Sequence, residues 1–364
     1  MRIIHCADLH LDSNLQMNFT KEQARERNME LFATFEQMVQ YGEREHVQAI
    51  LLVGDLFDTS TPSSAMANAV LEVIASHPSI YFFYVRGNHD RHFSWREAEK
   101  LPENLKVFDH NWKTFSLGNL AVSGIECEGD SLFFQAGQLE LPADKINLVL
   151  LHGKVVSKEE NTGEDLVPLP LLRGKGIDYL ALGHLHSYQK ELLEGKSSYC
   201  YSGCLEGRGY DECGQKGFVL LEIKEDVREI HTEFITFGKR RIFEVPVSVS
   251  ECMTSAQMAR KIEQRLAEEN VCDRDMVKVI LRGAVDVACE KNHIFLQRRF
   301  AERFFGFRLE DATTLSVDYS EFLVDETLKG EFVRMIQEVE LPEQDKVEII
   351  RYGILALAGE ELEE

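Results

Sequence analysis

Five short polar clusters in this sequence carry residue types that bind divalent metal ions. Each holds a carboxylate, an imidazole or a carboxamide, and each directly follows a short apolar run. In chain order they are Asp8-Leu9-His10, Gly54-Asp55-Leu56-Phe57-Asp58, Gly87-Asn88-His89-Asp90, His152-Gly153 and Gly183-His184-Leu185-His186. Oxygen and imidazole ligands together suit hard or borderline divalent cations. The pattern therefore predicts a metal centre if the fold brings the five clusters together.

The apolar runs before these clusters are typical of buried β-strands. They are rich in Ile, Val, Leu and Tyr and cover residues 3–6, 49–53, 80–85, 148–151 and 179–182. Residues 21–45 are expected to form a helix capped by Thr20 and Gln23, and a second helix is expected over 63–75. If the five strands lie in one sandwich, all five clusters converge on one edge.

The ordered set of motifs resembles the calcineurin-like metallophosphoesterase superfamily. D-x-H, G-D-x-x-D, G-N-H-D, a single His and G-H-x-H follow one another within about residues 1–223. The resemblance implies an α/β (α+β) fold with a four-layer αββα sandwich. It also implies that one metal ion binds Asp8, His10, Asp55 and His186, while the other binds Asp55, Asn88, His152 and His184. Two neighbouring ions need such a shared ligand to offset their repulsion, and Asp55 would supply it.

The ligand set also bears on the metal and on the catalytic groups. Four of the seven ligands are imidazoles, which favours Mn, Fe or Zn over Ca or Mg, and the resemblance favours two Mn²⁺ ions. His89 is the candidate general acid for the leaving oxygen, and Asp90 is expected to orient its ring. Two roles are open for Asp58 and Asp12: direct participation in the reaction, or support of a metal ligand.

Within the superfamily, the motif details resemble the SbcD-type nuclease subunits of bacterial SbcCD complexes. The segments 4–12, 54–59, 201–206 and 214–217 carry this resemblance, with Ser202 and Cys204 where that family has Pro and Ser. It implies a Mn-dependent DNA exonuclease and endonuclease that hydrolyses phosphodiester bonds by a two-metal mechanism in DNA repair and recombination. It also implies DNA and an SMC-like coiled-coil ATPase (SbcC-like) as partners, and leaves a homodimer through helices near the site open.

Three parts of the chain are expected: a catalytic domain at 1–238, a capping domain at 239–320, and C-terminal helices at 321–364. The capping domain is predicted to form a βαβ-type unit, with strands at 243–249 and 276–281 and helices at 255–269 and near 293–304. Two further helices are expected at 325–339 and 342–358. Val347, Ile350, Ile354 and Leu357 form an apolar stripe, either a core face or a docking face for a coiled-coil partner.

Composition agrees with a globular protein of about two domains. The 364 residues are 44% hydrophobic and 28% charged. The net charge of −22 argues against coating nucleic acid by bulk electrostatics, but local binding through metal ions stays open. The eight cysteines form no C-x-x-C pair, the sequence has no apolar run of membrane-spanning length, and we expect no secretory signal. We therefore expect a cytoplasmic protein with reduced thiols and no membrane contact.

Other functions compete with the nuclease interpretation. The superfamily uses one metal site on many substrates, so the alternative is a metallophosphodiesterase or phosphatase acting on a small molecule or a phosphoprotein. The net charge favours it slightly, but Thr59 and Asp90 depart from the G-D-x-x-D-R-G and G-N-H-E motifs of protein phosphatases. A catalytically idle scaffold would not need the complete ligand set. Contact with phosphate is an open role for Arg86, Arg91 and His92. For Phe93 and Trp95, stacking on a base and packing are both open.

Overall fold

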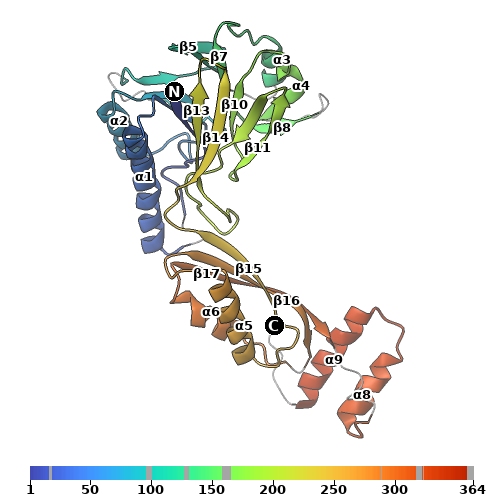
Figure 1. The fold of residues 1–364 in the computed structure, drawn as a ribbon. Helices are drawn as coiled ribbons and strands as arrows, with labels where there is room; N and C mark the ends of the chain where they lie inside the picture. The colour runs from blue at the N-terminus through green and yellow to red at the C-terminus, as the bar shows by residue number, and fades with distance from the viewer. Residues whose placement is uncertain are drawn as a thin grey trace. The chain divides into compact units, whose positions relative to one another are not determined.

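The computed structural model describes residues 1–15, 19–95, 101–126, 131–157, 165–287, 289–316, 322 and 324–358. Contacts divide the chain into two units, Met1–Arg241 and Ile242–Glu364, whose strands and helices are traced in Figure 1. The expected boundary lies after Gly238, and the finer division near residue 320 stays a prediction. Among the described residues, no helix is both long and apolar enough to cross a membrane.

Two six-stranded mixed sheets build the first unit. The first has the order β14-β13-β1-β2-β3-β4 and the second the order β11-β12-β10-β7-β6-β5. The strands of the first sheet are β1 (Arg2–Cys6), β2 (Ala49–Val53), β3 (Tyr81–Val85), β4 (Leu105–Val107), β13 (Gly217–Lys224) and β14 (Glu229–Thr236). Those of the second are β5 (Lys113–Leu117), β6 (Leu120–Gly124), β7 (Ile146–His152), β10 (Tyr179–Gly183), β11 (Gln189–Glu194) and β12 (Ser197–Tyr201). The expected α/β class is confirmed.

The five strands that precede the polar clusters fall into two parallel groups. β1, β2 and β3 run parallel in the first sheet, and β7 and β10 run parallel in the second. Leu51 and Phe83 from one sheet pack with Leu148 and Ala181 from the other in a fully buried core between the sheets. Side chains alternate between the two faces of a strand, so every second side chain of these strands points away from this core. Those side chains need another layer of structure to bury them.

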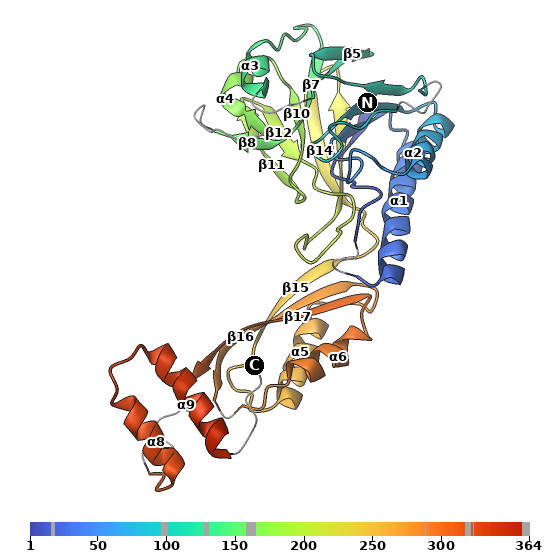
Figure 2. The same cartoon turned by 180° about the vertical axis from the view of Figure 1, so that it is seen from behind.

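Helices provide that cover on both outer faces. α1 (Lys21–Arg44) packs on the first sheet, where Tyr41 meets the Phe218 ring at 5.3 Å, and α2 (Ser64–Ser76) follows β2. α3 (Ser131–Gly137) and α4 (Leu169–Leu172) bury Leu132 and Leu172 with Leu180 of the second sheet. Figure 2 shows the two helix pairs on opposite sides of the sheets. Covered on both faces, β2 is buried at every residue, which explains its unbroken apolar run.

The helix starts in this unit follow the sequence closely. Thr20 caps α1, and its capping box with Gln23 is present, as predicted. α2 begins at Ser64 with Ser63 as its N-cap, one residue after the expected start. A separate pair of short parallel strands, β8 (Lys154–Val156) and β9 (Leu166–Pro168), extends from the end of β7. The polar clusters of the sequence lie at the ends of strands in this first unit.

The second unit contains a three-stranded parallel sheet in the order β15-β16-β17. Its elements are β15 (Ile242–Ser248), α5 (Ser255–Glu268), β16 (Met276–Asp286), α6 (His293–Ala301) and β17 (Gly306–Ser316), followed by α8 (Leu328–Gln337) and α9 (Glu343–Ala358). The sequence prediction missed β17 and ended β16 too early. The reason is that β17 is an edge strand whose second half, from Glu310 to Ser316, is polar and largely exposed.

Candidate metal centre

The first group of predicted ligands meets where β1 and β10 end. His10 Nε2 lies 3.2 Å from His186 Nε2 and 3.7 Å from Asp55 Oδ2. Potential ligand atoms of Asp8, His10 and His186 all lie within 4.8 Å of one another. The Asp8 carboxylate also accepts hydrogen bonds from the His184 backbone amide, at 3.0 and 3.1 Å. The structure thus brings Asp8, His10, Asp55 and His186 together.

The second group lies on the other side of Asp55. His152 Nε2 is 3.0 Å from Asn88 Oδ1 and 3.4 Å from Asp55 Oδ2. His184 Nδ1 is 3.2 Å from the same Asn88 oxygen. Asp8, Asp55 and His152 form a further set of ligand atoms within 4.8 Å. Asp55 therefore contacts both groups, where a bridging carboxylate is needed.

Hydrogen bonding in the first group shows that these side chains fit a cation. His10 Nδ1 donates to Asp58 Oδ1 at 2.9 Å, and His186 Nδ1 donates to Glu212 Oε1 at 2.7 Å. Because an ionised carboxylate only accepts, each neutral ring keeps its proton on Nδ1 and a lone pair on Nε2. The two lone pairs then face each other at 3.2 Å, which is repulsive unless a proton or a metal ion lies between them.

The charges around the buried carboxylates of Asp8 and Asp55 point the same way. Burial raises the pKa of the Asp8 carboxyl to about 7. Burial also opposes ionisation of Asp55, yet the neighbouring His152 and His10 hold the pKa of Asp55 below its usual range. Although burial lowers the pKa of His152, Asp55 and Asp8 raise it to about 10. The buried carboxylates therefore demand positive charge, which a proton on His152 or a divalent cation can supply.

The backbone at the ligands is held in an unusual conformation. Asp8, His10 and Asp55 have positive φ angles of 53°, 45° and 49°, and His184 has φ of 103°. Residues with a Cβ rarely adopt positive φ, and such strain persists only where surrounding structure enforces it. Here the amides of Asp8 and His10 donate to the carbonyls of Gly54 and Asp55, so the ends of β1 and β2 fix each other.

Two glycines allow the close approach of the ligand loops. A Cβ on Gly54 would lie 2.0 Å from His152 Nδ1, and Gly54 has φ of 83°. A Cβ on Gly87 would lie 2.2 Å from Asp55 Oδ1. No side chain fits at either position without displacing a proposed ligand. The glycines of the G-D-x-x-D and G-N-H-D motifs thus serve packing around the site.

Comparison with known proteins agrees with this geometry. A family model described as calcineurin-like phosphoesterase matches residues 1–188, just over half of the chain, including all seven predicted ligands. The chain belongs to the calcineurin-like phosphoesterase family. The resemblance drawn from the motifs is confirmed, and the His and Asp side chains described above suit the metal ions of such an enzyme.

Three relatives place this phosphoesterase more closely. The uncharacterized metallophosphoesterase YhaO of Bacillus subtilis is 31% identical over 309 residues, 78% of this chain and 72% of that relative. The DNA double-strand break repair protein Mre11 of Sulfolobus acidocaldarius is 25% identical, covering 79% of this chain and 76% of the relative. The SbcD subunit of the nuclease SbcCD from Staphylococcus epidermidis is 23% identical, covering 67% and 72%. The phosphoesterase is a distant homologue of Mre11 and SbcD proteins.

His89 of the phosphoesterase lies beside the first group of ligands. Its ring centroid is 4.7 Å from that of His10, and its Nδ1 is 3.2 Å from the backbone carbonyl of Asp58. The side chain is 41% exposed. If Nδ1 donates to this carbonyl, Nε2 is the nitrogen that can reach a substrate. The position is compatible with a proton donor next to the metal centre.

Asp90 has another role than the one expected from the sequence. Its carboxylate is fully buried, and Oδ2 accepts from the Leu56 amide at 2.9 Å and the Tyr84 hydroxyl at 2.5 Å. Oδ1 accepts from the Gly87 amide at 2.7 Å. The expectation that Asp90 orients the His89 ring is wrong, because the buried Asp90 carboxylate binds these three donors while His89 Nδ1 faces the Asp58 carbonyl. Asp90 instead ties the G-N-H-D loop to the G-D-x-x-D loop.

Asp58 and Asp12 support other groups. Asp58 Oδ1 accepts from His10 Nδ1 and, at 2.5 Å, from the Arg208 guanidinium, so it holds the ring of a predicted ligand. Asp12 Oδ2 accepts from the Ser63 amide at 2.7 Å, in front of α2. Sequence reasoning missed Arg208 and Glu212, which lie outside the five clusters. Their only signal was their place between the two SbcD-like segments 201–206 and 214–217.

The two arginines near the G-N-H-D motif are paired with carboxylates. Arg86 donates to Glu126 and, at 2.6 Å, to the Phe93 carbonyl, while Arg91 forms an ion pair with Asp165. Arg86 is therefore used to hold the segment after the motif. Its contacts favour a structural role over a phosphate contact.

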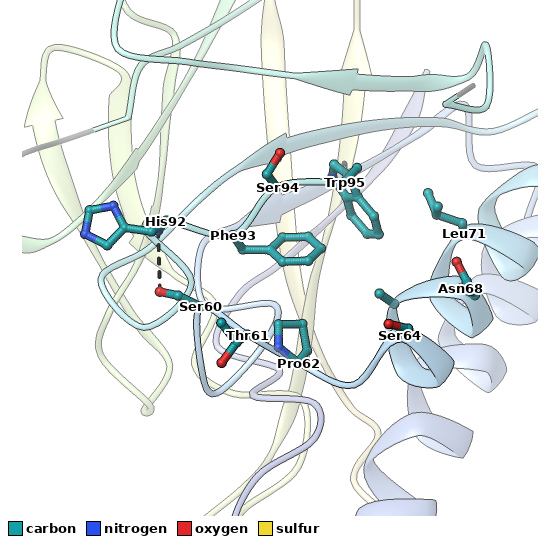
Figure 3. A pocket seen from close by; sticks show the side chains of 11 residues that line it. Ser60, Thr61, Pro62, Ser64, Asn68, Leu71, His92, Phe93, Ser94 and Trp95 are labelled. Carbon is teal, nitrogen blue, oxygen red and sulfur yellow. Dashed lines mark hydrogen bonds between the residues drawn. The ribbon is translucent and has the colours of Figure 1, made fainter. Parts of the chain in front are cut away.

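Phe93 and Trp95 pack into an aromatic cluster. Their ring centroids are 4.7 Å apart, and Phe57 lies 4.6 Å from Phe93, which is only 6% exposed. This favours packing over base stacking for Phe93. The two rings border a cavity of about 340 Å³, shown in Figure 3. His92 is on the same cavity wall, and its amide donates to Ser60 Oγ.

Proposed function

We propose that this phosphoesterase is a Mn-dependent DNA exonuclease and endonuclease subunit of the SbcD type. The observation that carries the proposal is the convergence of seven metal-ligand side chains, which hydrolysis by a two-metal mechanism requires. The names of two relatives supply the substrate: one is a DNA double-strand break repair protein and the other a nuclease subunit. DNA as the substrate is an extension from these relatives to this chain.

The proposed metal ions occupy two positions. Asp8, His10, Asp55 and His186 would hold one ion, and Asp55, Asn88, His152 and His184 the other. Mn²⁺ is proposed, and Fe or Zn also suits four imidazole ligands. When bound, the ions would activate water and neutralise charge on the phosphate.

His89 is proposed to hold the proton for the leaving oxygen. The Asp58 carbonyl accepts from Nδ1, so a second proton on Nε2 would point toward the substrate, and the ring would be neutral after donating it. Asp58 also holds the His10 ring through its carboxylate. One loop thus sets the direction of both the proton donor and a ligand. Asp90 contributes by fixing the loop rather than by touching a reacting atom.

The second unit is proposed to act as the capping domain over DNA, and α8 and α9 as the site for an SMC-like coiled-coil ATPase. Val347 and Ile350 of the predicted stripe are buried, which favours a core role for them. Other apolar side chains on these helices are exposed, among them Leu328, Met335 and Tyr352. They offer the apolar surface that a partner helix would cover.

A truncation before Asp325 is expected to abolish ATPase binding without loss of metal, and retained binding would contradict this assignment.

A phosphodiesterase for a small molecule or a phosphoprotein is the second candidate. Two observations favour it: the net charge of −22, and the 31% identity to YhaO, whose name states no substrate. Repulsion between an acidic protein and DNA lowers the encounter rate, although it does not prevent local binding at a metal centre.

Cleavage of end-labelled duplex and single-stranded DNA in the presence of Mn²⁺ tests the proposal. Bis-p-nitrophenyl phosphate serves as a small diester, and Asp55→Ala serves as the inactive control. DNA cleavage that the control lacks would support the nuclease assignment. Turnover of the small diester without DNA cleavage, even after a coiled-coil ATPase partner is added, would favour the second candidate.

A further inference from the structure

Arg208 joins the carboxylates of Asp58 and Glu212 beside the predicted metal centre. Its Nη1 donates to Asp58 Oδ1 at 2.5 Å, and its Nε and Nη2 donate to Glu212 Oε1 at 3.2 and 3.0 Å. The Arg208 backbone amide adds a hydrogen bond of 2.6 Å to the other Glu212 oxygen. The guanidinium is a planar fork, so it can hold both carboxylates in fixed directions.

Each of these carboxylates holds one histidine. Asp58 accepts from His10 Nδ1 at 2.9 Å, and Glu212 accepts from His186 Nδ1 at 2.7 Å. The Nε2 atoms of the two rings then meet at 3.2 Å. Asp58, Arg208 and Glu212 thus connect the two imidazole rings through consecutive hydrogen bonds. The set of contacts is closed because the Nε2 atoms of the two rings also face each other. We call Asp58, Arg208 and Glu212 the brace.

The brace is largely shielded from water. The side chains of Arg208, Asp58 and Glu212 are 19%, 22% and 6% exposed. Charged hydrogen bonds at this depth are stronger and more directional than those on the surface. The brace is therefore stiff enough to set the direction of the two imidazoles that it touches.

The second group of ligands is oriented by different means. His152 Nδ1 donates to the Val53 carbonyl at 3.0 Å, so a backbone group fixes this ring. The brace contacts His10 and His186, which both belong to the first group. Loss of the brace should thus affect the two metal positions unequally.

We propose that Arg208 and Glu212, together with Asp58, are positioning residues that fix the tautomer and direction of His10 and His186 and thereby set the affinity of the first metal position. The proposal rests on the proposed binding of two metal ions. It does not depend on DNA as the substrate.

The charge of Arg208 and its positioning role predict opposite effects of its removal on the affinity for the metal ion. As a cation near a cation site, Arg208 repels the metal ion, and removing it should tighten binding. As a positioning group, it keeps two lone pairs aimed at one point, and removing it should weaken binding. Loss of such outer partners typically weakens metal binding by about 10–100-fold. The sign of the change therefore distinguishes the two roles.

Calorimetric titration of the metal-free full chain with Mn²⁺ measures this sign. We expect two binding events in the native chain and, in Arg208→Ala, one event weakened by about 10–100-fold with the other unchanged. Arg208→Lys keeps the charge but not the fork, and should stay weakened. Arg2→Ala is the matched control, because Arg2 also joins two carboxylates, Glu45 and Glu222, away from the site.

Three outcomes would overturn the inference. Unchanged or tighter Mn²⁺ binding in Arg208→Ala would overturn it while leaving the proposed function intact, and so would full recovery in Arg208→Lys. A native chain that binds no pair of Mn²⁺ ions would overturn both. If Arg208→Ala does not fold, as judged by its melting temperature without metal, Glu212→Gln takes its place. This substitution keeps the shape of Glu212 and should weaken the same event.

Discussion

Replacing His89 with alanine should separate proton donation from metal binding. The His89 ring is partly exposed, and its Nδ1 contacts a backbone carbonyl rather than a proposed ligand. The hydrogen bond from the residue to Asp55 Oδ1, at 2.9 Å, comes from the backbone amide, which alanine retains. We therefore expect the Mn²⁺ affinity to be preserved and the free energy of unfolding to change by less than about 0.5 kcal/mol.

The size of the rate loss should depend on the leaving group. A positioned proton donor typically contributes about 10²–10⁴-fold to a rate, or about 3–5 kcal/mol of barrier. The alkoxide that leaves DNA is a strong base and needs the proton. The p-nitrophenolate ion is a weak base and leaves without one. His89→Ala should thus lose most of its DNA cleavage but little of its activity on bis-p-nitrophenyl phosphate.

Single-turnover rates on both substrates at saturating Mn²⁺ provide the assay. His231→Ala, a substitution of an exposed histidine on β14, controls for the general effect of removing an imidazole. Equal losses on the two substrates, or no loss on DNA, would refute the role of proton donor. A loss that more Mn²⁺ restores would show that His89 acts through metal binding instead.

Three further substitutions test the surroundings of the site. Gly54→Ala should lower the Mn²⁺ stoichiometry measured by metal analysis, because its Cβ would lie 2.0 Å from His152 Nδ1. Arg27→Met should destabilise the first unit by about 3–5 kcal/mol in urea unfolding, because it leaves the buried Glu206 carboxylate without its arginine. Burial alone would raise the pKa of Glu30, but neighbouring cations lower it to about 2. The stability that Glu30 contributes should therefore be present above about pH 4.5 and be lost as the pH falls toward 2, and Glu30→Gln should flatten this part of the pH profile.

The parts of the site that were predictable from the sequence are local in the chain. Asp8 and His10, or His184 and His186, are two residues apart at the end of an apolar strand, so residue type and spacing suffice to find them. The same holds for the start of α1, where Thr20 and Gln23 form the capping box within one turn. Short patterns of this kind specify both an element and the groups at its end.

The missed parts depend on contacts between distant residues. Arg208 meets Asp58 across 150 residues of sequence, and only its place between two SbcD-like segments sets it apart from a surface arginine. Asp90 follows His89 directly, which suggested that they interact, yet its carboxylate turns inward to Tyr84 and Leu56. Neighbouring positions in a tight loop point in different directions, and the direction is set by the partners available in the folded chain.

The loop that carries Arg208 is itself fixed by a buried charge network on α1. Arg27 is fully buried and donates to Glu206 and, at 2.6 Å, to the Gly207 carbonyl, directly before Arg208. On the far side of Arg208, Lys216 Nζ donates to the His186 carbonyl at 2.7 Å. The brace is thus held at both ends of its loop, once by a helix and once by a proposed ligand residue. Burying Arg27 is costly unless its partners stay in place, so we expect changes that destabilise α1 to disturb the loop that carries Arg208 as well.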